Sequence, residues 1–309
     1  MPGNQRARCE QQWRDSSALH SVMAGSRVGG ATLSLSAAVA PLPRGIMPCE
    51  AYSGNEGEPM QLRPNRVKRK LEAGEPAFVI GGFTHADDID SFGPVGFDGV
   101  WLEGEHGGVD AADLGNLTRA CDIWGMTSVV RVNRNDQGLI YRTLDRGAQA
   151  IVVPHVDSRA DAENVVAGGK FPPLGRRGLF TSRQGYGVPD YLAQANDETL
   201  LIALIEDIEA WHNLDDILEV EGIGVFFVAP SDFAASMGHI GDVGHPEVQE
   251  KIEDALRRIV SAGRTAGTLA MTGNAQRFAE IGVRFFFTVT SPWLAAGADS
   301  FRAAVSAGI

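Results

Sequence analysis

The sequence predicts a (β/α)8 TIM barrel, and two observations carry this prediction. Eight short apolar runs recur between Ala77 and Thr290, most of them rich in β-branched and aromatic residues, as strands buried on both faces should be. The runs alternate with helical segments, and eight such units over roughly 230 residues match the usual size of this barrel. The runs are 77–83, 97–103, 127–132, 149–154, 200–206, 224–230, 265–271 and 284–290.

A doubly wound open sheet is the alternative arrangement for alternating strands and helices. The segment after the first run, GGFTHAD from Gly81, lacks the G-x-G-x-x-G spacing of a dinucleotide-binding loop. This favours the barrel, and we expect no nucleotide cofactor.

Helical patterns precede or separate the runs. Residues 65–74 (NRVKRKLEAG) form a basic helix closed by a glycine, and residues 111–124 place apolar side chains at helical spacing. Residues 246–262 form an amphipathic helix that begins with proline. The connection after the fourth run is long and inserts residues 169–192, which we expect to serve as a lid or a subunit contact.

Residues 1–62 differ from the rest of the chain. They are rich in Gly, Ser, Ala, Pro and Arg and show no sustained helical or strand period. We expect a disordered extension or a start codon placed too early in the gene model; the alternative is an organellar targeting peptide, because arginines precede a run of small residues. The barrel domain is therefore expected to span residues 63–309.

Composition excludes several classes of partner. With 27 basic and 39 acidic residues the net charge is −12, which argues against nucleic acid or an anionic membrane surface. No apolar run approaches the roughly 18 residues of a membrane-spanning helix. Cys9, Cys49 and Cys121 have no metal-ligand spacing and are too few for a disulfide framework, so we expect a reducing, cytoplasmic compartment.

Charged side chains end several of the predicted strands, where barrel enzymes place their chemistry. Residues 103–106 (Glu-Gly-Glu-His) end the second run, and Arg131 ends the third, with Asp136 shortly after. Glu206 and Asp232 close the fifth and sixth runs. Neighbouring strands lie about 4.8 Å apart, so these two carboxylates can converge on one point.

A cation explains two converging carboxylates. Carboxylates without cysteine or clustered histidine favour a hard ion such as Mg²⁺ or Mn²⁺. The alternatives are that Asp232, after Pro-Ser, is a helix N-cap, or that one of the two acids forms a surface ion pair.

The second and third strand ends also allow proton transfer. Arg131 can bind an oxyanion, and Asp136 can hold the imidazole of His106 in one tautomer. The alternatives are a hydrogen-bonded structural role for His106 and a barrel-mouth salt bridge for Arg131.

Seven segments in the same order resemble the HpcH/HpaI aldolase family, the class II (metal-dependent) pyruvate aldolases related to citrate lyase. The resemblance covers roughly residue 65 to the C-terminus. The segments are GFDGVWLEGEH from Gly96, VVRVNRND from Val129, GAQAIVVPHV from Gly147, FPPLGRRG from Phe171, LIEDIEA from Leu204, VFFVAPSDFAASMG from Val225 and HPEVQ from His245.

The resemblance implies a phosphoenolpyruvate/pyruvate-type barrel and a carbon–carbon lyase that forms a pyruvate enolate from a 2-oxo acid. It implies that Glu206 and Asp232 hold a divalent metal, Mg²⁺ with Mn²⁺ or Co²⁺ as alternatives. It also implies that Arg131 stabilises the enolate and that His106 is the base, oriented by Asp136. One branch of the family decarboxylates oxaloacetate and uses the enolate to form carbon–carbon bonds, while others cleave 4-hydroxy-2-oxo acids.

The resemblance also implies a substrate-carboxylate loop at residues 229–232, in which Ala229, Ser231 and Asp232 offer backbone N–H groups. This chain departs from the family in that loop, where many members have Gly-Pro-Ala-Asp. It also has Glu103 where many have Asp and Leu204 where they have Gln, which puts the aldehyde acceptor in question. No predicted strand end carries a lysine, so we expect no Schiff base.

The family forms homo-oligomers, commonly hexamers, in which the last helix packs on a neighbouring subunit. Here residues 293–304 are the candidates for that helix, with closure of the barrel within one chain as the alternative. Two other functions remain open: a non-catalytic barrel subunit and a metal-dependent hydrolase.

Overall fold

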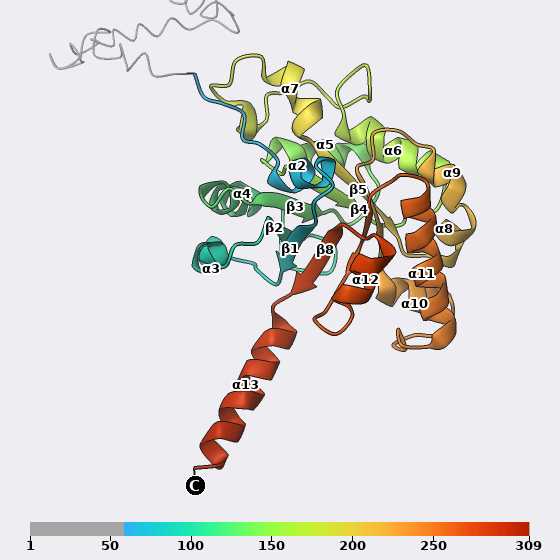
Figure 1. Cartoon of the computed structure of the whole chain (residues 1–309). Helices are drawn as coiled ribbons and strands as arrows, with labels where there is room; N and C mark the ends of the chain where they lie inside the picture. The colour runs from blue at the N-terminus through green and yellow to red at the C-terminus, as the bar shows by residue number, and fades with distance from the viewer. Residues whose placement is uncertain (1–58, 309) are drawn as a thin grey trace, which may run out of the picture. The chain divides into compact units, whose positions relative to one another are not determined.

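The computed structural model describes residues 59–308 and shows a closed barrel of eight parallel strands (Figure 1). Each strand pairs with the next, and β8 pairs with β1 to close the barrel. The predicted (β/α)8 barrel is confirmed, and every predicted run contains a strand. The strands are β1 (Ala77–Gly81), β2 (Gly99–Glu103), β3 (Thr127–Arg131), β4 (Ala150–Val153), β5 (Leu200–Ile205), β6 (Val225–Val228), β7 (Ala266–Leu269) and β8 (Phe285–Val289).

Helices surround the strands (Figure 1). The three helices predicted from sequence patterns correspond to α2, α4 and α11. The predictions for Cys9, Cys49 and nearly all of residues 1–62 fall outside the described residues. The helices are α2 (Arg66–Glu72), α3 (Ala86–Phe92), α4 (Leu114–Ile123), α5 (Gln137–Asp145), α6 (Arg159–Gly169), α7 (Tyr191–Glu198), α8 (Ile208–His212), α9 (Leu214–Leu218), α10 (Pro230–Ser236), α11 (Pro246–Ser261), α12 (Ala275–Ile281) and α13 (Ser291–Ser306), with short 3-10 turns η2 (Gly93–Val95) and η3 (Arg183–Gly185).

Two apolar layers form the core. Inward-facing side chains of alternate strand positions, such as Trp101, Leu204 and Phe227, fill the barrel interior. The other strand face packs against the helices, with Leu102 and Phe226 among its fully buried residues. The barrel interior is therefore packed with side chains rather than hollow.

The helix α2 packs against the strand starts. Its N-cap, Asn65, is fully buried, accepts a hydrogen bond from Lys68 N and donates to the carbonyl of Gln149 at 3.0 Å. Val67 packs into the same apolar cluster as the barrel interior. This helix therefore joins the interior at the end opposite the strand termini that carry the charged residues.

The last helix, α13, differs from the others because none of its 16 residues is buried. It extends away from the barrel (Figure 1). The prediction left open whether this helix closes the barrel within one chain, and the structure shows that it does not.

Within residues 59–308, no helix combines the length and the apolar character needed to cross a membrane.

Candidate active site

Arg131 and Glu103 form a tightly held pair at the ends of β2 and β3. The strand register places them opposite each other. Nε of Arg131 donates to both carboxylate oxygens of Glu103, at 3.0 and 2.8 Å, and Nη2 lies 2.7 Å from Oε2. A third contact joins Nη1 to Glu105 at 3.0 Å. The planar guanidinium is thus fixed in one orientation by two carboxylates.

Glu103 accepts further hydrogen bonds that hold it in its charged form. Trp101 Nε1 donates at 3.0 Å, and the backbone N–H groups of Glu105 and His106 donate at 2.8 and 3.1 Å. Burial alone would raise the pKa of Glu103, but the hydrogen bonds and charge of Arg131 outweigh it and leave the pKa below its usual value.

Glu206 lies in the opposite electrostatic situation at the end of β5. Its exposed fraction is 3%, and the backbone N–H of His155 donates to its Oε1 at 2.7 Å. Burial raises the pKa of Glu206, and the nearby charges of Asp232 and Glu105 raise it further. In residues 59–308, neither Lys nor Arg forms an ion pair with Glu206 or Asp232.

Asp232 lies in the first turn of α10, directly after β6. The N-cap of that helix is Ala229, with Pro230 at its start, so Asp232 is not the cap. Glu206 is buried, so it does not form a surface ion pair either. Both alternatives to a cation-binding role for this pair therefore disagree with the geometry.

A cavity of about 300 Å³ opens at the barrel mouth, with Arg131 and Asp232 in its wall, and Glu206 is not among its lining residues. The polar side chains of its wall come from three strand ends, and the rest of the wall is apolar. Its lining residues are Trp101, His106, Arg131, Leu204, Phe227, Ala229, Pro230, Ser231, Asp232, Leu269 and Phe287.

His106 and Asp136 are not joined in the structure. The His106 side chain is 68% exposed, and its Nε2 lies 3.8 Å from Glu105. Asp136 caps α5 by accepting a hydrogen bond from Leu139 N at 2.8 Å. The suggestion that Asp136 orients His106 therefore stays a prediction.

Two residues at the mouth received no role in the sequence analysis. Glu105 contacts Arg131, and His155 places Nδ1 3.5 Å from Glu206 and Nε2 4.0 Å from Glu105. His155 adopts a φ of 51°, a left-handed conformation that is uncommon outside glycine. The sequence signal was available, since His155 follows Pro154 at the end of the fourth predicted strand.

Comparison with known proteins identifies the family of this chain. Residues 81–286 match the family model described as HpcH/HpaI aldolase/citrate lyase. The chain belongs to this family. The predicted resemblance is confirmed, and the protein is a carbon–carbon lyase of the aldolase type.

The related proteins cover most of the chain. A hydroxypyruvate/pyruvate aldolase of Pseudomonas aeruginosa is 38% identical over 73% of this chain and 87% of its own length. A 4-hydroxy-2-oxo-heptane-1,7-dioate aldolase of Salmonella dublin is 36% identical over 77% of this chain and 94% of its own length.

Solved structures share the barrel. A family member from Burkholderia cenocepacia J2315 aligns with a TM-score of 0.74 and 27% identity, covering 78% of this chain and 99% of its own. Macrophomate synthase aligns with a TM-score of 0.68 and 21% identity, covering 81% of this chain and 93% of its own, which shows the shared fold.

Proposed function

We propose that this lyase forms a pyruvate enolate from a 2-oxo acid at a divalent metal held by Glu206 and Asp232. The buried carboxyl group of Glu206 carries this proposal, because the negative charge of Asp232 acts on it and no lysine or arginine in the described residues pairs with it. An all-oxygen donor set suits Mg²⁺, with Mn²⁺ or Co²⁺ as alternatives. A metal bound there supplies Lewis-acid stabilisation of negative charge on the keto oxygen.

Arg131 would bind and stabilise the enolate oxygen from the β3 side. Three of its five N–H donors are directed at Glu103 and Glu105, so two remain for substrate. Because the two glutamates already fix the guanidinium, little reorganisation is needed when charge develops on the substrate.

The loop at residues 229–232 would bind the substrate carboxylate. Ala229, Ser231 and Asp232 line the cavity. The N–H groups of Ser231 and Asp232, in the first turn of α10, have no partners within the helix, whereas the N–H of Ala229 already donates to the carbonyl of Ile205 at 3.1 Å. On this proposal the substrate would lie between α10 and Arg131.

His106 would serve as the base where one is required. It lines the cavity and is exposed enough to exchange protons with solvent. Retro-aldol cleavage and deprotonation of pyruvate need a base, whereas loss of CO₂ from oxaloacetate does not. We propose that Asp136 acts on His106 only after a rearrangement, since it caps α5 in this structure.

The substrate class is tested by following pyruvate release. The purified protein is incubated with Mg²⁺ and, in separate reactions, with oxaloacetate and a 4-hydroxy-2-oxo acid. We expect pyruvate from at least one, and complete loss after chelation. Full turnover without any divalent metal, or no pyruvate from either substrate beyond that of the protein-free reaction with Mg²⁺, would contradict the proposal. A hydrolase or a non-catalytic subunit would release none beyond that background.

We also propose that the protein is a homo-oligomer in which α13 packs on another subunit. Leu294, Ala298, Phe301 and Val305 fall on one face of this helix by their spacing, and Phe301 is 71% exposed. An apolar hollow of about 490 Å³ lies at the base of α13, lined by residues of β1, β8 and α12. Phe78 in this hollow is 45% exposed although it belongs to a barrel strand.

An eighth helix would normally cover this part of a barrel. Exchange of α13 between two copies would cover both hollows, as in domain swapping. Sedimentation of the full chain tests this: we expect an oligomer, and partial or full dissociation in Phe301→Asp. Ala296→Asp introduces the same charge away from the apolar face and should leave the assembly intact. A monomeric wild-type chain would exclude the exchange. The number of subunits, six by the family resemblance, and the cytoplasmic location stay predictions.

A further inference from the structure

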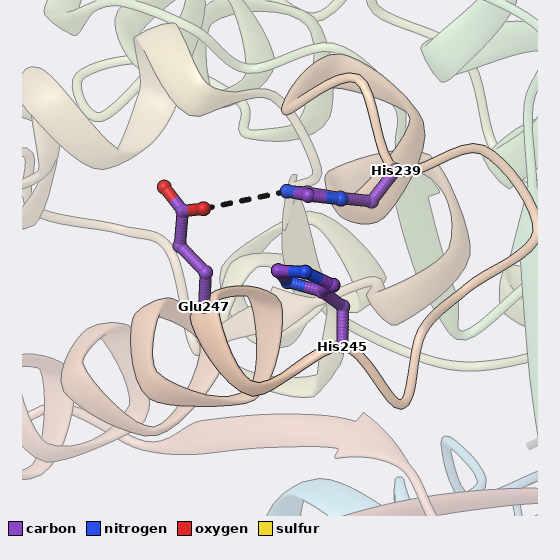
Figure 2. A group of neighbouring side chains, drawn as sticks. All are labelled: His239, His245 and Glu247. Atoms are coloured by element: carbon purple, nitrogen blue, oxygen red, sulfur yellow. Dashed lines mark ion pairs between the residues drawn. The ribbon is translucent and has the colours of Figure 1, made fainter.

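The described residues contain a second group of metal-ligating side chains outside the barrel mouth. His239, His245 and Glu247 lie together where the loop after α10 meets the start of α11 (Figure 2). Each residue offers one ligand atom, and the three atoms lie within 4.8 Å of one another. Nothing in the proposed lyase mechanism uses this group.

The backbone of the loop brings these residues together. His239 N donates to the carbonyl of Ala234 at 2.8 Å, which ends α10. Two successive turns follow, closed by hydrogen bonds from Asp242 N to His239 O at 3.0 Å and from His245 N to Asp242 O at 3.1 Å. The loop therefore presents its two imidazoles in a fixed relation before any ligand arrives.

The side-chain geometry is close to that of a small coordination site. The rings of His239 and His245 stack, with their centroids 3.7 Å apart. Nε2 of His239 lies 3.4 Å from Oε2 of Glu247 (Figure 2). Ligand atoms around a tetrahedral zinc ion are also separated by roughly 3.4 Å, because each bond is about 2.0–2.1 Å long.

A second observation concerns His245 alone. Its Nδ1 is buried and has no hydrogen-bond partner among the described residues. A buried ring nitrogen without a partner is costly, so the protein's own contacts do not account for the placement of this imidazole.

We propose that His239, His245 and Glu247 bind a zinc-type transition-metal ion. Two imidazoles and one carboxylate form a donor set that prefers Zn²⁺ to Mg²⁺, unlike the all-oxygen pair at the mouth. Three protein ligands leave a fourth position for water. Closing the group around the ion requires small rotations of the side chains, and Glu247 is 61% exposed and free to make them.

The ion joins two elements that flank the barrel mouth. His239 follows α10, which carries Asp232, and Glu247 lies in the first turn of α11. Bound zinc therefore fixes the loop between these helices and holds α10 in place. This role is structural, and it is separate from the metal at the mouth.

Zinc binding is tested in the full-length, untagged chain carrying Glu206→Gln, which removes one carboxylate from the mouth. After chelation and dialysis, the protein is titrated with Zn²⁺ in the presence of millimolar Mg²⁺, with circular dichroism as a check of folding. We expect one zinc per chain. Adding His239→Gln or His245→Gln should weaken binding at least about 100-fold, since even the loss of an outer-shell partner of a metal can cost 10–100-fold.

The matched control is His85→Gln in the same background, because that imidazole is 80% exposed and lies in another part of the chain. It should leave zinc binding unchanged. Zinc that stays bound after His245→Gln lies elsewhere in the chain, and that result overturns the proposal. The absence of zinc binding in folded Glu206→Gln protein overturns it as well. Since metal content is the readout, the result is independent of lyase activity.

Discussion

The two sides of the barrel mouth carry similar residues in opposite electrostatic states. At the ends of β2 and β3, Glu103 is ionised against Arg131, which holds its pKa below the usual value despite burial. At the end of β5, burial and the neighbouring charge of Asp232 raise the pKa of Glu206. On the first side a guanidinium of the protein pairs with the carboxylates, whereas for the second side we propose a cation from solution.

The largest effect is expected at Glu206, with which no lysine or arginine of the described residues pairs. Glu206→Ala should remove metal binding at the mouth and lower kcat at least about 10³-fold, because Lewis-acid stabilisation is worth several kcal/mol. Pyruvate release and metal content of the purified variant measure this. Glu209→Gln, an exposed change three residues along the chain, is the control and should retain activity. Wild-type turnover in Glu206→Ala would remove the contrast between the two sides.

A smaller effect is expected at Arg131, at the end of β3. Arg131→Lys keeps the charge but loses the planar fork that contacts Glu103 and Glu105. We expect kcat to fall about 10²- to 10³-fold, the usual cost of removing one oxyanion donor. Metal binding should be unchanged, since Arg131 is not a proposed ligand. Loss of the metal in Arg131→Lys would show that Arg131 also contributes to metal binding at Glu206 and Asp232.

Shortening Glu103 tests how finely Arg131 must be placed. Glu103→Asp keeps the negative charge but withdraws it by one methylene from the guanidinium. We expect kcat to fall by no more than about tenfold, since the remaining contact to Glu105 still orients Arg131. Glu103→Gln, which has the same length without the charge, should cost more. Steady-state kinetics measure both kcat values. A lower kcat in Glu103→Asp than in Glu103→Gln would mean that the length of this side chain matters more than its charge.

The smallest effect concerns the stability of the metal-free protein. A carboxyl group with a raised pKa contributes most to stability while protonated, and this contribution is lost as the pH rises through the folded-state pKa. Neutral Glu206→Gln avoids that loss. We expect the metal-free variant to melt a few degrees above the wild type at pH 8, since about 1 kcal/mol shifts Tm by 2–4 °C in a domain of this size.

The sign of this difference depends on pH. The two melting temperatures should converge as the pH falls through the pKa of Glu206 and both side chains become neutral. Added Mg²⁺ should stabilise the wild type more than the variant. A wild type that is more stable than the variant at pH 8 without metal would contradict a raised pKa.

The sequence by itself determined the barrel and the places where its charged residues lie. Eight apolar runs predicted eight strands, since strands buried on both faces need continuous apolar residues. The same runs put Arg131, Glu206 and Asp232 at strand ends, and parallel strands bring those ends to one edge. Motifs in the strands and loops were specific enough to indicate the family.

Only the tertiary structure decided which groups contact one another. It joined Arg131 to Glu103 and Glu105, placed His155 beside Glu206, and directed Asp136 to the start of α5. It also left α13 without intrachain burial and brought His239 close to Glu247. These outcomes depend on side-chain direction, loop turns and long-range packing, which the period and spacing of a sequence do not encode.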